Sequence, residues 1–434
     1  MTAGAAQAVC IEPATVLRGD VSVPGDKSIS HRALLIGALA EGESEIRGFG
    51  GSADTLTTAS ALRTLGVTVE VDGERARVAG VGLHGLRVSS APIDCGNAGT
   101  LMRLLAGILA GQPTAAQLTG DASLSRRPLE RIAEPLRQMG ATVKTTDGHA
   151  PMAIEGGALQ PIRYVLPVAS AQVKSCVLLA GLFATSGPTE VVEPLPTRDH
   201  TERLLRSSGA RVAAGAGAVR IWPAGSLGPQ SLDVPGDFSS AAPFLAATVL
   251  VPGSELRVHG VGVNPTRIGF IHVLERMGAR ISSFNRRVVA GEPVADLEIT
   301  AGELTATSIE AAEVATLIDE LPLFALVATR AHGTSTVSGA EELRVKESDR
   351  IETTTEAVRA VGGKISHTRD GFSVRGMSRR LRGGRVDARG DHRIAMVGAL
   401  AGLASRGGVT VEGAHWVTVS YPGFFEAIES LRTT

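Results

Sequence analysis

The sequence predicts an α/β fold made of two similar halves, each containing three smaller units. The first observation is an internal repeat, since the segment Val23–Arg32 returns 211 positions later as Val234–Ala242, with Val-Pro-Gly-Asp at the start of both copies. The second copy has no cation at the positions of Lys27, His31 and Arg32. Because only one copy carries cations, we expect an asymmetric site where the two halves meet.

The second observation is a set of six apolar helices, with starts about 70 residues apart. They are apolar almost all round, which predicts buried helices. Low aromatic content, 3%, and 52 glycines imply that these helices pack closely through small side chains. The predicted buried helices are Ser28–Ala40, Gly99–Gly111, Ser170–Ala184, Ser239–Val251, Leu317–Thr329 and His392–Ala404.

The third observation is a set of amphipathic helices, most of which end at a glycine that a short alternating strand follows. These are Asp54–Gly66, Leu129–Gly140, Thr201–Gly209, Arg267–Gly278 and Asp349–Gly362. Phe424–Leu431 is the sixth, and the chain ends before its strand. We expect an N-terminal strand near Ile11–Leu17 to complete that unit and to close the fold on itself.

Composition excludes several classes of protein. A chain of 434 residues with 43% hydrophobic residues and a formal net charge of -1 is globular and is not a general polyanion binder. Its three cysteines form no CxxC pair, which indicates reduced thiols and a cytoplasmic location. The opening Met1–Val9 lacks the features of a signal peptide, and no apolar run is long enough for a membrane span. We expect a monomer that binds neither nucleic acid nor membranes.

Polar residues gather at the starts of the buried helices. Capping explains Ser28, Thr100 and Ser170, but the cations Lys27, Arg103 and Arg393 oppose the helix dipole at an N-terminus. We infer that anions offset these cations, which predicts a ligand rich in phosphate and carboxylate groups.

Two acidic groups lie among these cations. The Asp319-Glu320 pair opens an otherwise apolar helix, and alternating charges run from Lys346 to Arg350. An acid among many cations is a candidate general base.

Other motifs carry less weight. The GxGxxG match at residues 80–85 precedes no helix, and the histidines form no HxH or HExxH pattern, so we expect no dinucleotide and no metal. The basic run Arg375–Arg385 contains no aromatic residue, which favours a solvated loop over a nucleic-acid patch.

Several motifs in order closely resemble the 5-enolpyruvylshikimate-3-phosphate (EPSP) synthase family over essentially the full chain. They are Pro24–Arg32, Asn97–Thr100, Arg126–Pro128, Lys346–Arg350 and Asp391–Arg393. The segments Pro167–Ser175, Arg198–Glu202 and Val419–Phe425 are most similar to the bacterial class II branch.

The resemblance implies the enolpyruvyl transferase fold, with two similar domains of three βαβαββ-type units and an active site in the cleft between them. We expect residues 1–20 and 236–434 to form a discontinuous domain and residues 21–235 to form an inserted one. The family transfers the enolpyruvyl group of phosphoenolpyruvate to the 5-hydroxyl of shikimate 3-phosphate and releases phosphate, without a metal or an organic cofactor.

The resemblance also assigns roles to individual residues. Asp319 would take the hydroxyl proton, while Glu347 and Lys27 would lie near the carbon that gains one. The shikimate 3-phosphate ligands would be Lys27, Ser28, Arg32, Ser170, Ala171, Gln172, Arg198, Asp319 and Lys346. The phosphoenolpyruvate ligands would be Lys27, Gly99, Arg127, Gln172, Arg350 and Arg393.

Three departures from the class I pattern suit class II. Ala171 replaces a serine and can contribute only its backbone, and Glu342 and Val419 replace substrate-binding residues, so we assign them no role. Gly99 resembles the glycine of glyphosate-sensitive members.

Two alternatives fit the sequence less well. A UDP-N-acetylglucosamine enolpyruvyl transferase shares the fold and the donor but carries a reactive loop cysteine, whereas the loop at residues 120–128 has none. A non-catalytic anion-binding protein on the same scaffold would not need Asp319 and Glu347.

Overall fold

The computed structural model describes residues 8–87 and 91–433. The segment relevant to a signal peptide, residues 1–7, lies outside this range. The chain divides into two compact units. Unit 1 contains residues 1–24, 236–287 and 293–434, and unit 2 contains residues 25–235 and 288–292. The first boundary therefore falls four residues after the predicted one, and a short segment at residues 288–292 groups with unit 2.

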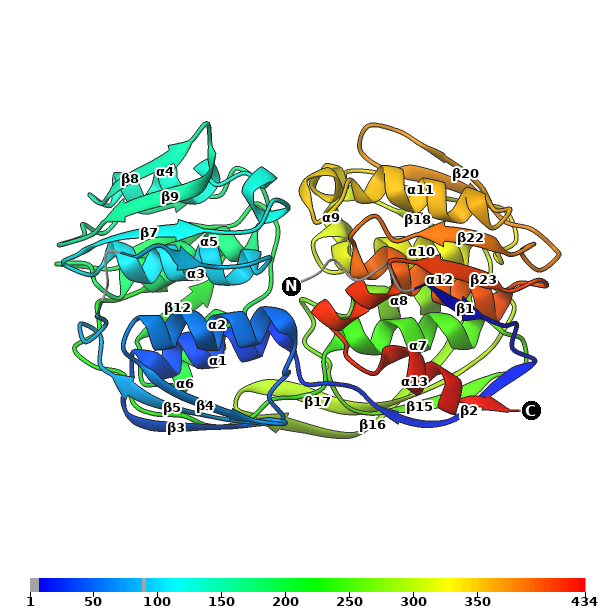
Figure 1. Ribbon diagram of the computed structural model, residues 1–434, viewed down its shortest axis with the longest axis horizontal. Helices are drawn as coiled ribbons and strands as arrows, with labels where there is room; N and C mark the ends of the chain where they lie inside the picture. The colour runs from blue at the N-terminus through cyan, green and yellow to red at the C-terminus, as the bar shows by residue number, and fades with distance from the viewer. Residues whose placement is uncertain (1–7, 88–90, 434) are drawn as a thin grey trace. The chain divides into compact units, whose positions relative to one another are not determined.

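Unit 2 contains three four-stranded sheets with one repeated topology (Figure 1). In each, a parallel pair of strands is extended by an antiparallel hairpin. The orders are β14 (Ser231–Asp233), β3 (Glu41–Arg47), β5 (Arg75–Val81), β4 (Thr68–Asp72); β6 (Ile93–Asp94), β7 (Ala115–Thr119), β9 (His149–Glu155), β8 (Thr142–Thr146); and β10 (Arg163–Val165), β11 (Thr189–Val192), β13 (Ala218–Ile221), β12 (Val212–Gly215).

The helices of unit 2 are of the two predicted kinds. The buried helices are α1 (Lys27–Ala38), α3 (Gly99–Ala110) and α5 (Ala171–Gly181), and the amphipathic ones are α2 (Ala53–Thr64), α4 (Glu130–Gln138) and α6 (His200–Ser207). Helix α3 contacts both other buried helices. A Cβ atom at Gly107 would lie 2.2 Å from the carbonyl oxygen of Cys176, so this glycine permits the close approach of α3 and α5.

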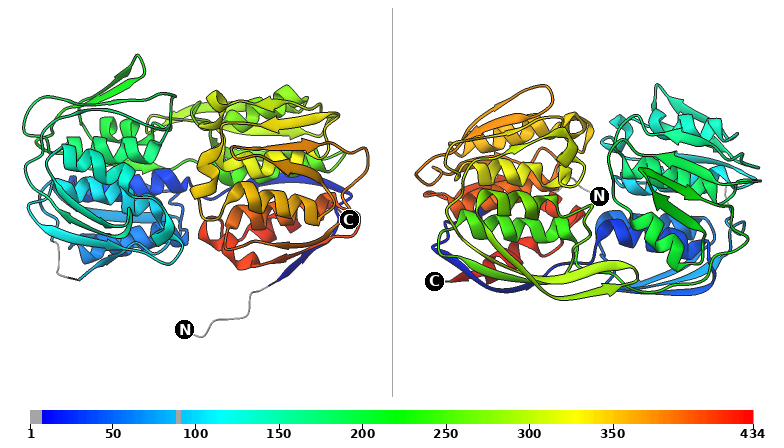
Figure 2. Two further views of the ribbon diagram at one scale, coloured as in Figure 1. Left: turned by 90° about the horizontal axis from the view of Figure 1, so that it is seen from above. Right: turned by 180° about the vertical axis from the view of Figure 1, so that it is seen from behind.

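Unit 1 repeats the plan with one larger sheet and one smaller sheet (Figure 2). The orders are β16 (Arg280–Val289), β17 (Glu292–Thr300), β15 (Glu255–Gly262), β2 (Val16–Ser22), β24 (Arg432–Thr433); β18 (Ser308–Ile309), β19 (Thr334–Val337), β21 (Phe372–Arg375), β20 (Lys364–His367); and β1 (Val9–Ile11), β23 (Val409–Glu412), β22 (Gly384–Asp387).

The buried helices of unit 1 contact one another around a separate hydrophobic core. They are α7 (Phe238–Leu250), α10 (Leu321–Ala328) and α12 (His392–Ala404). The other helices are α8 (Gly269–Met277), α9 (Ala311–Val314), α11 (Arg350–Ala360) and α13 (Phe424–Ser430). Among the described residues, no helix is both long and apolar enough to cross a bilayer.

The N-terminal segment closes the fold, although not as the single strand predicted over Ile11–Leu17. Strand β1 pairs with β23, whereas β2 pairs with β24 and β15 in a different sheet. Pro13 lies between the two strands and has no N–H to donate to a sheet, which is consistent with a break there. The prediction of one continuous strand was therefore wrong, but the prediction of closure was correct.

Candidate active site

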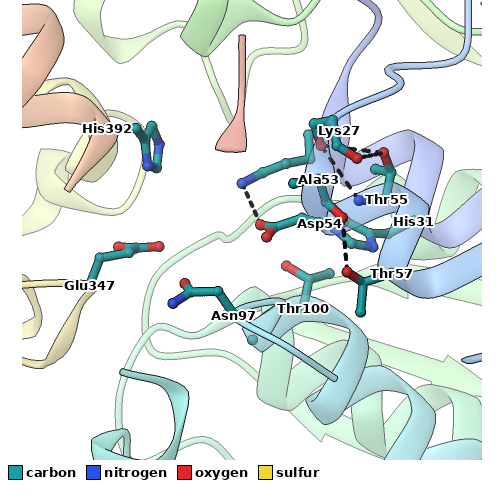
Figure 3. Close-up of polar contacts among 12 residues, drawn as sticks. Lys27, His31, Ala53, Asp54, Thr55, Thr57, Asn97, Thr100, Glu347 and His392 are labelled. Atoms are coloured by element: carbon teal, nitrogen blue, oxygen red, sulfur yellow. Dashed lines mark hydrogen bonds and ion pairs between the residues drawn. The ribbon is translucent and has the colours of Figure 1, made fainter. Parts of the chain in front are cut away.

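Helix α1 places a lysine at its first turn. Asp26 caps the helix by accepting a hydrogen bond from the backbone N–H of Ile29 at 2.9 Å. The Nζ atom of Lys27 lies 2.9 Å from a carboxylate oxygen of Asp54 in the first turn of α2 (Figure 3). A neighbouring helix therefore supplies an acid that offsets this cation, so the inference that Lys27 needs an external anion was incomplete.

One turn further along α1, Arg32 is buried and held on several sides. Its Nε donates to the hydroxyl of Thr201 at 2.7 Å, and its two terminal nitrogens donate to the carbonyl of Ser28 and the hydroxyl of Ser175 at 2.9 and 3.0 Å. Burial lowers the pKa of Arg32 to about 10, against the opposing charge of Glu202. All three guanidinium nitrogens have a partner, so a substrate anion would have to use the remaining N–H groups.

Behind Arg32 lies a buried ion-pair cluster on α5 and α6. Lys174 is 1% exposed, and its Nζ lies 2.7 Å from Glu202 and 3.1 Å from Glu193. The same atom donates to the carbonyl oxygen of Thr197 at 3.3 Å. Since Thr197 directly precedes the half-buried Arg198, this lysine holds the backbone next to Arg198.

The start of α5 faces the start of α3. Ser170 caps α5 by accepting from the N–H of Val173 at 3.4 Å, and the side chain of Gln172 donates to the hydroxyl of Thr100 at 3.0 Å. Ala171 is the first residue of α5 and offers its backbone N–H at that end. The structure thus joins the N-termini of two buried helices through one side-chain hydrogen bond.

Gly99 lies directly against two arginines. A Cβ atom there would lie 2.6 Å from Nη1 of Arg103 and 3.1 Å from Nη1 of Arg127. Arg127 is 7% exposed, and one of its terminal nitrogens donates to the side-chain oxygen of Asn97 at 2.7 Å. Asn97 in turn donates to Asp121 at 2.7 Å. Gly99 therefore leaves space that the guanidinium groups occupy.

Unit 1 contributes an arginine surrounded by carboxylates. Arg350, the first residue of α11, is 1% exposed and contacts Asp391 at 2.8 and 3.2 Å, Glu347 at 2.6 Å and Asp319 at 3.2 Å. Burial alone would lower the pKa of Arg350, but the charges of Asp391, Glu347 and Asp319 outweigh burial and raise it. Arg350 is thus a fixed cation that orients three acids.

A second arginine lies beside the same acids. Arg393 is at the start of α12, and its terminal nitrogens lie 3.8 Å from Asp319 and 3.7 Å from Glu320. Glu320 is fully buried and accepts a hydrogen bond from Ser239 at 2.6 Å. Asp319 and Glu320 belong to a short 3-10 turn over residues 318–320 that leads into α10, as the sequence predicted for an acidic pair opening an apolar helix.

The predicted site residues therefore form two groups, one on each unit. Unit 2 holds Lys27, Ser28, Arg32, Gly99, Arg127, Ser170, Ala171, Gln172 and Arg198, and unit 1 holds Asp319, Lys346, Glu347, Arg350 and Arg393. Lys346 is half-buried and precedes Glu347 after a 3-10 turn.

Sequence reasoning gave no role to several residues that hold these groups. Asp391 belongs to a recognised motif, yet its function as the main partner of Arg350 was missed, as were Thr201, Lys174 and Asn97. A polar residue at the start of a buried helix was the available signal for Asp391, which caps α12 by accepting from the N–H of Arg393 at 2.9 Å.

One trio of potential metal ligands lies elsewhere in unit 2. Within the described residues, Asp199, His200 and Glu292 bring ligand atoms within 4.8 Å of one another. The guanidinium group of Arg203 lies 2.8 Å from Asp199 and 3.9 Å from Glu292. A side-chain cation therefore already pairs with both acids, and the trio does not fit a metal site.

Comparison with known proteins places this arrangement in context. The family model of EPSP synthase (3-phosphoshikimate 1-carboxyvinyltransferase) matches residues 11–428. Relatives bearing the name 3-phosphoshikimate 1-carboxyvinyltransferase include a protein of Acidithiobacillus ferrooxidans, 50% identical over 95% of each chain. Another, from Desulforudis audaxviator, is 48% identical over 97% of this chain and 99% of its own.

Solved structures agree with this family. An EPSP synthase from Acinetobacter baumannii superposes with a TM-score of 0.87 at 41% identity over 99% of both chains. The enolpyruvyl transferase NikO from Streptomyces tendae gives a TM-score of 0.79 over 98% of both chains, and its 20% identity shows a shared fold alone. The predicted fold class and the predicted family are both confirmed.

Proposed function

The chain belongs to the EPSP synthase family, and from that premise we propose how its two groups of side chains divide the reaction. The reaction transfers the enolpyruvyl group of phosphoenolpyruvate to the 5-hydroxyl of shikimate 3-phosphate and releases phosphate, a step of the shikimate pathway. The observation that carries the proposal is the placement of Asp319 and Glu347 around the buried cation Arg350. Acids among the arginines repel bound anions, so a protein that only bound anions would not need them there for binding.

We assign recognition of shikimate 3-phosphate mainly to unit 2. Ser28, Ser170, Ala171 and Gln172 lie at helix N-termini, where N–H groups and hydroxyls suit a phosphate or a carboxylate. Arg198 and Lys27 supply the cations. The buried Arg32 supports this surface through its hydrogen bonds to Ser28, Ser175 and Thr201. From unit 1, Asp319 and Lys346 complete the set.

We assign the carboxylate and phosphate of phosphoenolpyruvate to Arg127, Arg350 and Arg393, with contributions from Lys27 and Gln172. Guanidinium groups suit both anions because their planar N–H groups pair with two oxygens at once. Gly99 keeps its neighbouring arginines in place by lacking a side chain. Because the ligands come from both units, both must act on the same bound substrates.

Proton transfers follow from the positions of the acids. The 5-hydroxyl is a weak nucleophile until a base takes its proton, and Asp319 is the proposed base. Protonation of the methylene carbon of phosphoenolpyruvate creates a cationic centre that this oxygen attacks, and we assign that proton to Glu347 or Lys27. The resulting tetrahedral ketal then loses phosphate, and its new methyl group gives up a proton, which restores the double bond of the enolpyruvyl group.

The wider setting is also part of the proposal. Reduced thiols at Cys10, Cys95 and Cys176 support a cytoplasmic location. A formal net charge of -1 supports action on small molecules without nucleic-acid or membrane partners. We further propose that the protein is a monomer.

Phosphate release tests the function directly. The protein is mixed with phosphoenolpyruvate and either shikimate 3-phosphate or UDP-N-acetylglucosamine as the acceptor. Release with shikimate 3-phosphate alone is the expected result. Release with neither acceptor would contradict the proposal and favour an anion-binding protein.

A further inference from the structure

A basic pocket lies on unit 1, away from the residues assigned to the reaction. This cavity of about 200 Å³ is lined by five cations, Lys364, Arg379, Arg380, Arg382 and Arg406, and by no acid. The cations come from separate parts of the chain: the start of β20, the segment between β21 and β22, and the turn after α12. The basic run at residues 375–385 contains Arg379, Arg380 and Arg382. Folding brings Lys364 and Arg406 next to them.

None of these five side chains makes an ion pair with any residue in the ranges 8–87 and 91–433. This differs from much of unit 1, where Arg276 pairs with Glu313 at 2.7 Å and Arg344 with Asp349 at 2.6 Å. Arg380 is also fixed in place, since its Nη1 donates to the carbonyl oxygen of Ala14 at 3.1 Å. The pocket therefore concentrates positive charge without an internal counter-ion.

Helix dipoles explain only part of this charge. Helices α11 and α12 both end beside the pocket. Each helix C-terminus carries about -0.5 of an elementary charge, which is why basic residues commonly follow it. Two such ends offset about one of the five positive charges, which leaves a surplus of about four. Nearby, burial lowers the pKa of the half-buried Arg330, and the charge of Arg380 lowers it further.

The pocket is distinct from the proposed active site. Arg350 begins α11 and Arg393 lies at the start of α12, whereas Gly362 and Arg406 of the pocket follow the ends of these helices. Helices of 11 and 13 residues are roughly 16 to 20 Å long. A ligand in the pocket would thus lie on the far side of the core from the acids.

We propose that this basic pocket binds a small anion carrying two or more phosphate groups. Four of its five cations are arginines, whose planar N–H groups match phosphate oxygens in pairs. No aromatic residue lines it, so it offers no surface on which a nucleic-acid base could stack. The phosphates alone therefore carry recognition.

Calorimetric titration of the full chain with sodium tripolyphosphate tests the proposal. The active-site arginines also attract phosphates, so wild type is expected to show two binding events. The double variant Arg382→Ser/Arg406→Ser should lose the pocket event, with affinity there at least tenfold weaker. The matched control Arg18→Ser/Arg280→Ser removes two exposed arginines of unit 1 outside the pocket and should bind as wild type does.

Activity distinguishes a local effect from misfolding, since kcat and both KM values should stay at wild-type levels in the pocket variant. The variant Arg382→Lys/Arg406→Lys keeps the charge and should bind more tightly than the serine variant. Equal binding by the serine variant and the control would overturn the proposal. A preference for ATP over tripolyphosphate would overturn recognition through the phosphates alone. A preference for a single-stranded oligonucleotide would overturn the proposed ligand class.

Discussion

Lys174 supports the proposed shikimate 3-phosphate surface without touching substrate, and Lys174→Met tests this. The change keeps the length and the apolar stem of the side chain but removes its charge. Two carboxylates then lose their cation: Glu202, which is 1% exposed, and Glu193, which also accepts from Thr197. In the wild-type protein, burial raises the pKa of Glu202 and the charge of Lys174 opposes that rise.

The loss of stability can be bounded, because Glu202 can take up a proton when its partner is removed. Protonating a carboxyl with an ordinary pKa near 4.3 costs about 3.7 kcal/mol at pH 7 and about 1 kcal/mol at pH 5. The pH 7 value lies within the roughly 3 to 5 kcal/mol typical of a broken buried pair. For a unit of this size, the Tm should fall by about 7 to 15 °C at pH 7 and by about 2 to 4 °C at pH 5.

The sign of this pH dependence is fixed. A glutamate with a raised pKa holds more protons in the folded state than in the unfolded state, so the variant loses stability as pH rises above about 4.3. The double variant Lys174→Met/Glu202→Gln removes the charge of Glu202 and leaves only that of the more exposed Glu193, so it should recover most of the loss at pH 7. Exposed Lys144 provides the control Lys144→Met, which should leave the Tm unchanged.

Thermal unfolding at pH 5, 7 and 8 measures these effects, and steady-state kinetics measures the effect on the site. KM for shikimate 3-phosphate should rise several-fold, because Thr197 and Arg198 lose their support, while KM for phosphoenolpyruvate changes little. A Tm loss that is the same at pH 5 and pH 8 would refute the electrostatic reasoning. Equal increases in both KM values would refute the positioning role.

Three further predictions concern other buried groups. Gly99→Ala places a methyl group within 3.1 Å of Arg127, so KM for phosphoenolpyruvate should rise at least tenfold in initial-rate assays while that for shikimate 3-phosphate stays within twofold. His31 is fully buried, and burial lowers its pKa, so stability should fall by about 1.4 kcal/mol for each pH unit below about 6.5. In His31→Gln, urea unfolding between pH 5 and 7 should show a smaller slope. Arg350→Lys cannot replace the bidentate contact with Asp391 and should lower stability by about 3 kcal/mol or more in the same urea assay, with little residual turnover.

Regular features of the fold were predictable because each is local in the sequence. The apolar composition of one set of helices predicts that they are buried. The amphipathic helices end at glycines that adopt left-handed geometry, as Gly278 does with φ 107° at the end of α8. The break between β1 and β2 was not predictable in the same way. Each strand pairs with a partner roughly 400 residues away in sequence, and the two partners lie in different sheets.

The site was predictable in its residue types but less so in its pairings. Cations and acids at helix starts pointed to Lys27, Asp319 and Arg350, since a cation at a helix N-terminus opposes the dipole and an acid among cations is a candidate base. Their partners, Asp54 and Asp391, lie 27 and 41 residues away, and only the packing of neighbouring helices brings them together. The basic pocket shows the same limit, because its cations come from three segments.

The central claim is that Asp319 takes the 5-hydroxyl proton and does not serve chiefly in binding. Asp319→Asn keeps the size of the side chain and removes its basicity. Single-turnover rapid quench with phosphoenolpyruvate, beside calorimetry of shikimate 3-phosphate binding, separates the two roles. We predict turnover lower by at least a thousandfold with shikimate 3-phosphate affinity within a few-fold of wild type. Near-normal turnover, or a loss of turnover that a matching loss of affinity explains, would contradict the account.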